Sequence, residues 1–132
     1  IDSILPEADI LYLAMPETPK TKNLISRKRL DLLKTSCGIV NIGRQSTIDY
    51  DALCEKLKAN KIAGAILDVF TPEPIELNSK LWEIPNLIIT PHVSSDDGES
   101  YVRLTLELFT KNLKLFISNK PLINQVNKNL GY

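Results

Sequence analysis

The chain has 132 residues, enough for one domain with a buried core and too few for two. Hydrophobic residues make up 43% and charged residues 24%, as in ordinary globular proteins, and 16 Lys and Arg balance 16 Asp and Glu. A net charge of zero without a basic block predicts no nucleic-acid partner. Every apolar run is shorter than the roughly 18 residues that a membrane span needs, so we expect no membrane association.

The start of the chain and its two cysteines give expectations about secretion, metal binding and disulfide bonds. The chain begins with Ile1 rather than Met, and its start, IDSILPEAD, lacks the basic region of a signal peptide. Cys37 and Cys54 do not form a ligand-like cluster with His92, so we expect no metal site. One disulfide between them is an alternative, but we favour two free thiols in a reducing cytoplasm.

Four short apolar runs predict strands. They are ADILYLAM (8–15), GIVNIG (38–43), AGAILDVF (63–70) and NLIITP (86–91). The runs are rich in Ile, Leu and Val and barely alternate, which is typical of strands covered on both faces in a parallel sheet. The first run predicts an inner strand, whose second neighbour would lie upstream of Ile1. We therefore expect the chain to be a fragment.

Helical patterns lie between and after these runs. Residues 26–34 predict a helix capped by Ser26, and residues 49–60 predict one capped by Asp49. Only residues 79–84 look helical in the connection between the last two strands. A long helix is expected from Asp96 to about residue 118, with Asp96 and Glu99 as a capping box. Its apolar face comprises Val102, Leu106, Phe109, Leu113, Phe116 and Ile117.

The alternation of strands and helices predicts an α/β fold with a doubly wound parallel sheet of about four strands and a long C-terminal helix. The long helix has more apolar surface than one sheet face needs. We expect residues 96–132 to pack toward another domain or a partner that the chain does not include.

Four charged or titratable residues follow the predicted strands. Arg44 follows the second strand, Asp68 lies near the end of the third with Glu73 just beyond it, and His92 follows the fourth. Ligands of open parallel sheets bind beyond the carboxyl ends of the strands. Because neighbouring strands lie about 4.8 Å apart, these side chains are expected to converge at one edge.

Each of these residues has an ordinary explanation when taken alone. Arg44 would be a solvated cation, His92 a surface histidine and Glu73 a loop charge. Asp68 is the hardest to explain in this way, because burial among aliphatic residues disfavours a carboxylate without polar partners. Their common position beyond the strands favours a functional site.

The chain also resembles a known family. The resemblance is carried by ADILYLAMPETPKTKNLI, GIVNIGRQSTIDYDAL, GAILDVFTPEP, LWEIPNLIITPH and PLINQVNKNLGY. From about Leu5 to its end, the chain resembles the second half of the Rossmann-like nucleotide-binding domain of the D-isomer-specific 2-hydroxyacid dehydrogenases. The PHVSSD stretch and the closing Gly131 and Tyr132 are most similar to the glyoxylate/hydroxypyruvate reductase-like branch.

The resemblance implies a catalytic set of Arg44, Glu73 and His92. Arg44 and His92 would bind the substrate, a small 2-oxo or 2-hydroxy acid, through its carboxylate and its reacting oxygen. Glu73 would orient the His92 ring and favour its protonated form.

The cofactor implied is NAD or NADP. Its binding residues would be Asp68 at the carboxamide, Ile42 and Gly43 on the nicotinamide side, and Met15, Pro16 and Thr21 beside the adenosine half. The family is often dimeric, so the resemblance also implies a homodimer for the full-length protein.

Three features depart from the family pattern, and two rival interpretations stay open. The G-x-G-x-x-G turn is absent, so half of the cofactor cradle is missing and we expect the chain to be inactive alone. In addition, Gln45 stands where the family commonly has Gly, and Ser94 and Ser95 replace a small apolar residue and Gly. The first rival is a dehydrogenase-like module that binds nucleotides or recruits partners without turnover. The second is a flavodoxin-like or receiver-type domain, which would need neither His92 nor Glu73 at one edge.

Overall fold

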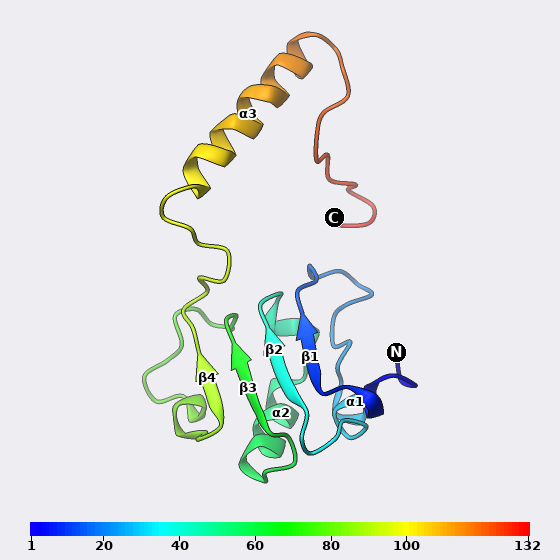
Figure 1. The fold of residues 1–132 in the computed structure, drawn as a ribbon, viewed down its shortest axis with the longest axis vertical. Coiled ribbons are helices and arrows are strands. Elements are labelled where there is room, and N and C mark those ends of the chain that lie inside the picture. The colour runs from blue at the N-terminus through cyan, green and yellow to red at the C-terminus, as the bar shows by residue number, and fades with distance from the viewer. The chain divides into compact units, whose positions relative to one another are not determined.

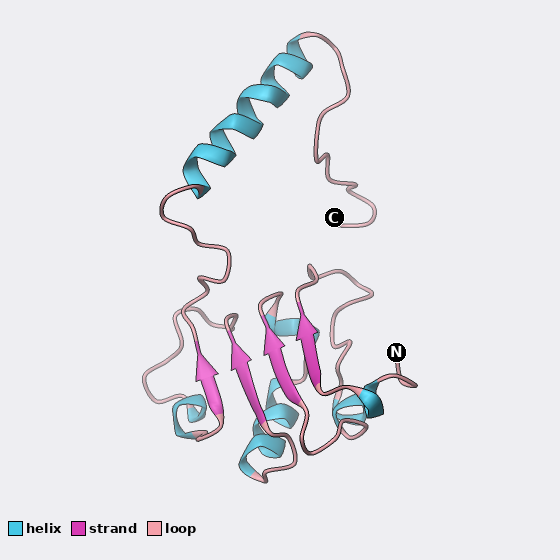
Figure 2. Cartoon of the chain, in the orientation of Figure 1, coloured by secondary structure: helices cyan, strands magenta, loops and turns pink.

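The computed structural model describes residues 1–132 and contains two compact units, Ile1–Ser94 and Ser95–Tyr132. The first unit holds one sheet with short helices, and the second holds a long helix and a tail (Figures 1 and 2). The strands are β1 Ile10–Leu13, β2 Gly38–Asn41, β3 Gly64–Leu67 and β4 Leu87–Ile89. The α-helices are α1 Arg27–Leu30, α2 Tyr50–Lys58 and α3 Tyr101–Ile117. Three short 3-10 helices, Leu5–Glu7, Gln45–Thr47 and Lys80–Glu83, complete the elements.

The four strands form one parallel sheet in the order β1-β2-β3-β4, and each strand pairs with the next along the chain. All four predicted strands are present, although each is shorter than its apolar run. The predicted fold class is confirmed. Because the strands are parallel, all four carboxyl ends lie at the same edge of the sheet (Figure 1).

The core lies on one face of this sheet, where α1 and α2 cover the strands (Figure 1). Leu53 and Leu57 of α2 are fully buried. They share one core cluster with Ile39 of β2 and Leu67 of β3. The Asp49 side chain accepts the Ala52 N–H at 2.9 Å, so the predicted cap of this helix is confirmed.

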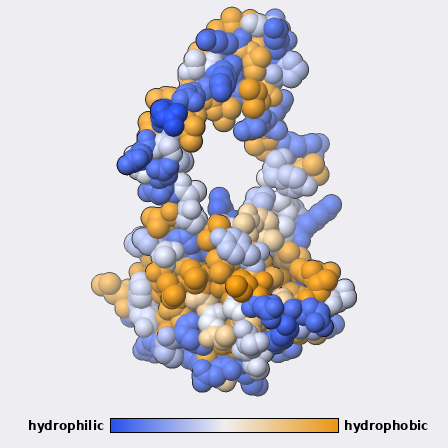
Figure 3. All heavy atoms as spheres, viewed as in Figure 1, coloured by the Kyte–Doolittle hydropathy of each residue, from blue (hydrophilic) through white to orange (hydrophobic).

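The opposite face of the sheet is apolar and open. One row across the strands consists of Tyr12, Val40, Ile66 and Ile88, and three of these four side chains are exposed, as is Ile10. Hydrophobic side chains gather over the strands on this face (Figure 3). The prediction that both faces are covered is therefore wrong for this chain, because its connecting helices lie on one side of the sheet.

The first predicted helix is much shorter than expected. α1 ends at Leu30, and Ser26 makes no side-chain capping bond. Beyond α1 the hydrogen bonds change to three-residue spacing, from Leu32 N–H to the Arg29 carbonyl and from Leu33 N–H to the Leu30 carbonyl. The residues after α1 therefore form a turn and a bend rather than a helix. Leu33, part of the apolar pattern that suggested a helix, is nevertheless buried.

The long helix begins later than expected, and the predicted capping box is absent. α3 begins at Tyr101, and neither Asp96 nor Glu99 caps it. Asp97 instead accepts hydrogen bonds from the backbone N–H groups of Glu99 and Ser100. These bonds hold the preceding residues in a turn rather than a helix.

The second unit leaves the predicted apolar face of α3 exposed. The six stripe residues, Val102, Leu106, Phe109, Leu113, Phe116 and Ile117, have exposed fractions of 44–73%. The tail folds back on another face of α3, where the Asn112 side chain donates to the Ile123 carbonyl and accepts its N–H. No helix of the chain combines the length and the apolar character that crossing a membrane requires. Both thiols are free, with Cys37 buried.

Candidate active site

The loops that follow the four strands bring the predicted site residues to one edge of the sheet. Met15 and Pro16 follow β1, and Ile42, Gly43 and Arg44 follow β2. Asp68 follows β3 directly, and Glu73 lies a few residues beyond it. His92 follows β4. The parallel topology accounts for this arrangement, because every strand ends at the same edge.

Glu73 and His92 are in direct contact. Glu73 Oε2 lies 2.9 Å from His92 Nδ1, and Glu73 Oε1 accepts the Phe70 N–H at 2.7 Å. The hydrogen bonds from His92 and from the Phe70 N–H lower the pKa of Glu73. Both side chains are partly exposed, at 37% for Glu73 and 45% for His92. A fixed carboxylate therefore orients an imidazole that solvent and small molecules can reach.

Asp68 is buried, and its polar partners come from the turn that contains His92. Its Oδ1 accepts the Thr90 hydroxyl at 2.5 Å and the Val93 N–H at 2.9 Å. Its Oδ2 accepts the Ser94 N–H at 2.9 Å. Only 1% of Asp68 is exposed, so these donors replace the water that a carboxylate loses on burial. Burial raises the pKa of Asp68, but the three hydrogen bonds outweigh it and lower the pKa to about 2.

This pKa predicts how the stability of the first unit depends on pH. The pKa of Asp68 is 3.8 in an ordinary environment and about 2 in the folded chain. The ionised carboxylate therefore contributes fully to the free energy of unfolding above pH 3.8, the ordinary pKa. This contribution is lost as the pH falls from 3.8 toward 2. We expect a loss of about 2 kcal/mol over this window, at 1.36 kcal/mol for each pKa unit.

Urea denaturation of the chain and of Asp68→Asn, at pH values across the window, measures this contribution. The difference in free energy of unfolding between the two proteins should shrink as the pH falls. A constant difference would show that Asp68 does not titrate as its hydrogen bonds predict.

Arg44 lies at the same edge but makes no hydrogen bond or ion pair with Glu73 or His92. Its Nη1 donates to the Gly43 carbonyl at 2.7 Å, and its side chain is otherwise exposed. The structure thus brings two members of the predicted catalytic set together and leaves the third nearby with four free N–H donors.

The backbone of the Arg44 loop is held by Asn41, which the sequence analysis did not single out. Asn41 is fully buried at the end of β2. Its Oδ1 accepts the Gly43 N–H and its Nδ2 donates to the Arg44 carbonyl, both at 3.1 Å. Thr47 Oγ1 also donates to the Arg44 carbonyl, at 2.7 Å. A polar residue within an apolar strand was the available signal, and it is the same signal that Asp68 gave.

Tyr50 connects this loop with the loop that carries Glu73. Its hydroxyl accepts from Asn41 Nδ2 at 3.4 Å and donates to the Val69 carbonyl at 2.7 Å. Its ring contacts Phe70 edge to face, with centroids 6.2 Å apart. Burial raises the pKa of Tyr50, which keeps the phenol protonated as a donor. The loops that carry Arg44 and Glu73 therefore share Tyr50, which is half-buried, as a common support.

Five of the residues predicted to bind the cofactor lie in the loops after β1 and β2: Met15, Pro16, Thr21, Ile42 and Gly43. Gly43 packs so closely against the loop after β1 that an added Cβ would lie 2.7 Å from the Met15 carbonyl oxygen. Thr21 Oγ1 donates to the Pro16 carbonyl at 2.7 Å. Ile42 is half-buried, and its N–H bonds to the Leu13 carbonyl. The close approach at Gly43 explains why glycine stands there.

We predict that Gly43→Ala lowers the free energy of unfolding by about 1–3 kcal/mol, as overpacking does elsewhere. The clash is with backbone atoms of Met15, which cannot rotate away. Gly98→Ala is the matched control, because nothing lies within 4 Å of its added Cβ. Thermal denaturation compares the two. Equal effects at both positions would contradict the importance of the close approach.

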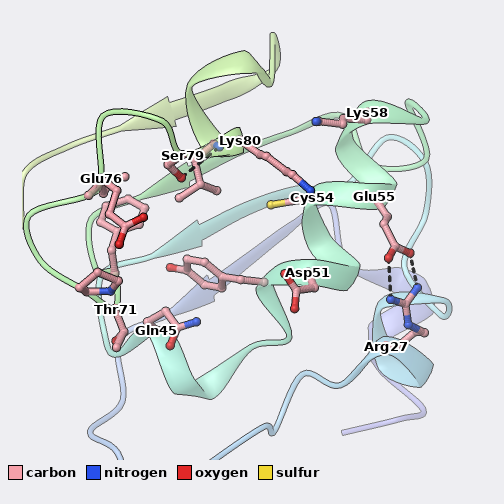
Figure 4. A pocket seen from close by; sticks show the side chains of 15 residues that line it. Arg27, Gln45, Asp51, Cys54, Glu55, Lys58, Thr71, Glu76, Ser79 and Lys80 are labelled. Atoms are coloured by element: carbon pink, nitrogen blue, oxygen red, sulfur yellow. Dashed lines mark hydrogen bonds and ion pairs between the residues drawn. The ribbon is translucent and has the colours of Figure 1, made fainter.

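Two cavities lie near this edge. The first, of about 490 Å³, has Glu73 and His92 in its wall together with the Trp82 ring, whose N–H donates to the Glu76 carbonyl. The second, of about 770 Å³, lies between α2 and residues 70–81 and contains the Arg27–Glu55 ion pair (Figure 4). None of the predicted site residues lines the second cavity. The sequence analysis did not identify Trp82 as part of the site.

The chain is similar to known proteins in sequence and in fold. Residues 1–94 match the family model described as "D-isomer specific 2-hydroxyacid dehydrogenase, NAD binding domain". A crystal structure of a D-isomer-specific 2-hydroxyacid dehydrogenase from Xanthobacter autotrophicus Py2, in complex with NADPH and MES, aligns with a TM-score of 0.91 and 31% identity. That alignment covers 99% of this chain and 53% of the other.

Two curated relatives have different activities. Glyoxylate/hydroxypyruvate reductase B of Pectobacterium carotovorum is 41% identical over 76% of this chain and 31% of its own length. D-3-phosphoglycerate dehydrogenase of Haemophilus influenzae is 34% identical over 96% of this chain and 32% of its own length. The chain thus spans about a third of the length of each of these relatives.

Proposed function

The chain belongs to the D-isomer-specific 2-hydroxyacid dehydrogenase family, and from this premise we propose that it is part of an oxidoreductase. The proposed reaction transfers a hydride between NAD or NADP and a small 2-oxo or 2-hydroxy acid of the glyoxylate or hydroxypyruvate kind. The contact between Glu73 and His92 at the carboxyl edge of the sheet carries this proposal. It supplies an oriented acid–base group where ligands of parallel sheets bind.

In the reducing direction, negative charge develops on the carbonyl oxygen of the substrate. We propose that protonated His92 donates a proton to this oxygen through Nε2, because Nδ1 is engaged by Glu73. In the oxidising direction the same nitrogen removes the proton from the hydroxyl. Glu73 fixes the orientation of the ring through its 2.9 Å contact with Nδ1.

Arg44 is the proposed partner of the substrate carboxylate. A planar guanidinium pairs with two carboxylate oxygens in a fork geometry that lysine cannot reproduce. Its donors other than the one bonded to the Gly43 carbonyl are available, and its side chain is exposed.

The residues present fit a nicotinamide nucleotide. Asp68 Oδ2 has only one hydrogen bond within the chain and so retains a lone pair for the carboxamide. The backbone at Ile42 and Gly43 would line the nicotinamide side, with Met15, Pro16 and Thr21 toward the adenosine half. When bound, the cofactor supplies or accepts the hydride, and the protein contributes alignment and charge.

An assay of the full-length protein tests the proposed function. Reduced nicotinamide should be consumed when glyoxylate or hydroxypyruvate is added, with NADH and NADPH assayed separately. Cofactor binding without consumption for any small 2-oxo acid would favour the rival, a nucleotide-binding module without turnover. The full-length protein is the appropriate material because the chain spans about a third of its curated relatives.

We also propose that the exposed apolar stripe of α3 is covered in the full-length protein. The substrate domain or the second subunit of a homodimer would provide the covering surface. The proposal is supported by the six exposed side chains of the stripe, since apolar patches of this kind usually mark an interface.

A further inference from the structure

Resting on the proposed function, we infer that Asp68 and Thr90 are positioning residues that hold the His92 turn in its reactive geometry. The carboxylate belongs to the end of β3, whereas its three donors, Thr90, Val93 and Ser94, belong to the segment after β4. The donors flank His92 on both sides. One buried side chain therefore fixes the backbone before and after the proposed acid–base group.

The backbone of His92 needs such support. Its φ is 57°, in the left-handed region that residues other than Gly adopt uncommonly, although Asn, Asp and His do so more often than the rest. Conformations of this kind persist at functional sites only where the surrounding structure enforces them. The two N–H groups that follow His92 both bond to Asp68, so the carboxylate stabilises this conformation.

Thr90 also holds the Asp68 carboxylate, and it is not among the residues proposed to contact the cofactor. Its hydroxyl bonds to the same oxygen, Oδ1, that accepts the Val93 N–H. The Thr90 side chain thus prevents the carboxylate from rotating away from the turn. The low pKa of Asp68 agrees with this arrangement, because each of these donors stabilises its charged form.

Thr90→Val tests the inference, since it removes the hydroxyl and keeps the shape of the side chain. In the 132-residue chain, we expect amide hydrogen exchange at Val93 and Ser94 to become at least about tenfold faster, as loss of a charged hydrogen bond implies. Thr90→Ser should restore slow exchange. Thr105→Val is the matched control, because its hydroxyl bonds only to the Tyr101 carbonyl within α3.

In the full-length enzyme, Thr90→Val should lower kcat by about tenfold and should raise KM for the nicotinamide cofactor by less, because the Ser94 N–H still holds Asp68 Oδ2. Thr90→Ser should recover kcat, and Thr105→Val should not alter it. A general loss of stability would not produce this division between kcat and KM. Unchanged exchange at Val93 and Ser94, or unchanged kcat despite faster exchange, would overturn the inference. If the wild type shows no turnover, the proposed function fails, and the exchange measurement still decides whether Asp68 and Thr90 hold the turn.

Discussion

Replacing His92 by Gln in the full-length enzyme should slow turnover by about 10²- to 10⁴-fold, which is the usual contribution of a general acid or base. Glutamine has a similar reach but cannot donate a proton from a charged ring. Glu73 would remain bonded to the Phe70 N–H, so the loop beside the site should keep its shape. Steady-state kinetics and a fluorescence titration of the reduced cofactor measure turnover and binding separately, and we expect binding to change little.

The left-handed backbone at this position calls for a second variant. His92→Asn accommodates a positive φ better than Gln and also lacks the acid–base group. It should lose as much activity as His92→Gln if proton transfer is the cause. Turnover close to that of the wild type in either variant would remove the proton-transfer role from His92.

Replacing Arg44 by Ala should reduce kcat/KM for carboxylate substrates by about 10- to 100-fold. This range corresponds to the roughly 1.5–3 kcal/mol of a hydrogen bond to a charged group, at 1.36 kcal/mol for each factor of ten. Arg44→Lys should be intermediate, because lysine keeps the charge but lacks the fork geometry. The cofactor affinity should remain close to that of the wild type.

A control for Arg44 is available on the same unit. Arg27→Ala removes an exposed arginine that pairs with Glu55 and contacts no site residue, so kcat/KM should not change. If Arg44→Ala behaves as this control does, Arg44 is not the carboxylate partner. The substrate would then be held by another group at the edge of the sheet.

The strands and the edge at which the site lies could be predicted from the sequence. Short runs of branched aliphatic residues separated by helical patterns specify a parallel sheet, and the topology then decides which residues share an edge. The start of α3 could not be predicted in the same way. Asp96 and Asp97 are equally suited to cap a helix, yet neither does: Asp97 closes a turn, and Ser100 is the N-cap residue of α3 without a side-chain hydrogen bond.

The hydrogen-bond donors to Asp68 also could not be predicted from local sequence patterns. Its donors lie 22 to 26 residues further along the chain, and no sequence spacing reveals that they fold onto the end of β3. The sequence indicated only that a buried carboxylate needs hydrogen bonds. It led to a cofactor carboxamide as the expected partner, which stays a prediction, and the structure adds three donors from the chain itself.

The segment that runs from Glu73 to Trp82 is placed where an insertion would be tolerated. Its start is fixed by the bond from the Phe70 N–H to Glu73, while the His92 turn is anchored separately on β3. Leu77, near its middle, is 99% exposed. An insertion at Leu77 would therefore leave both anchors in place, because neither the Phe70–Glu73 bond nor the bonds to Asp68 involve this residue.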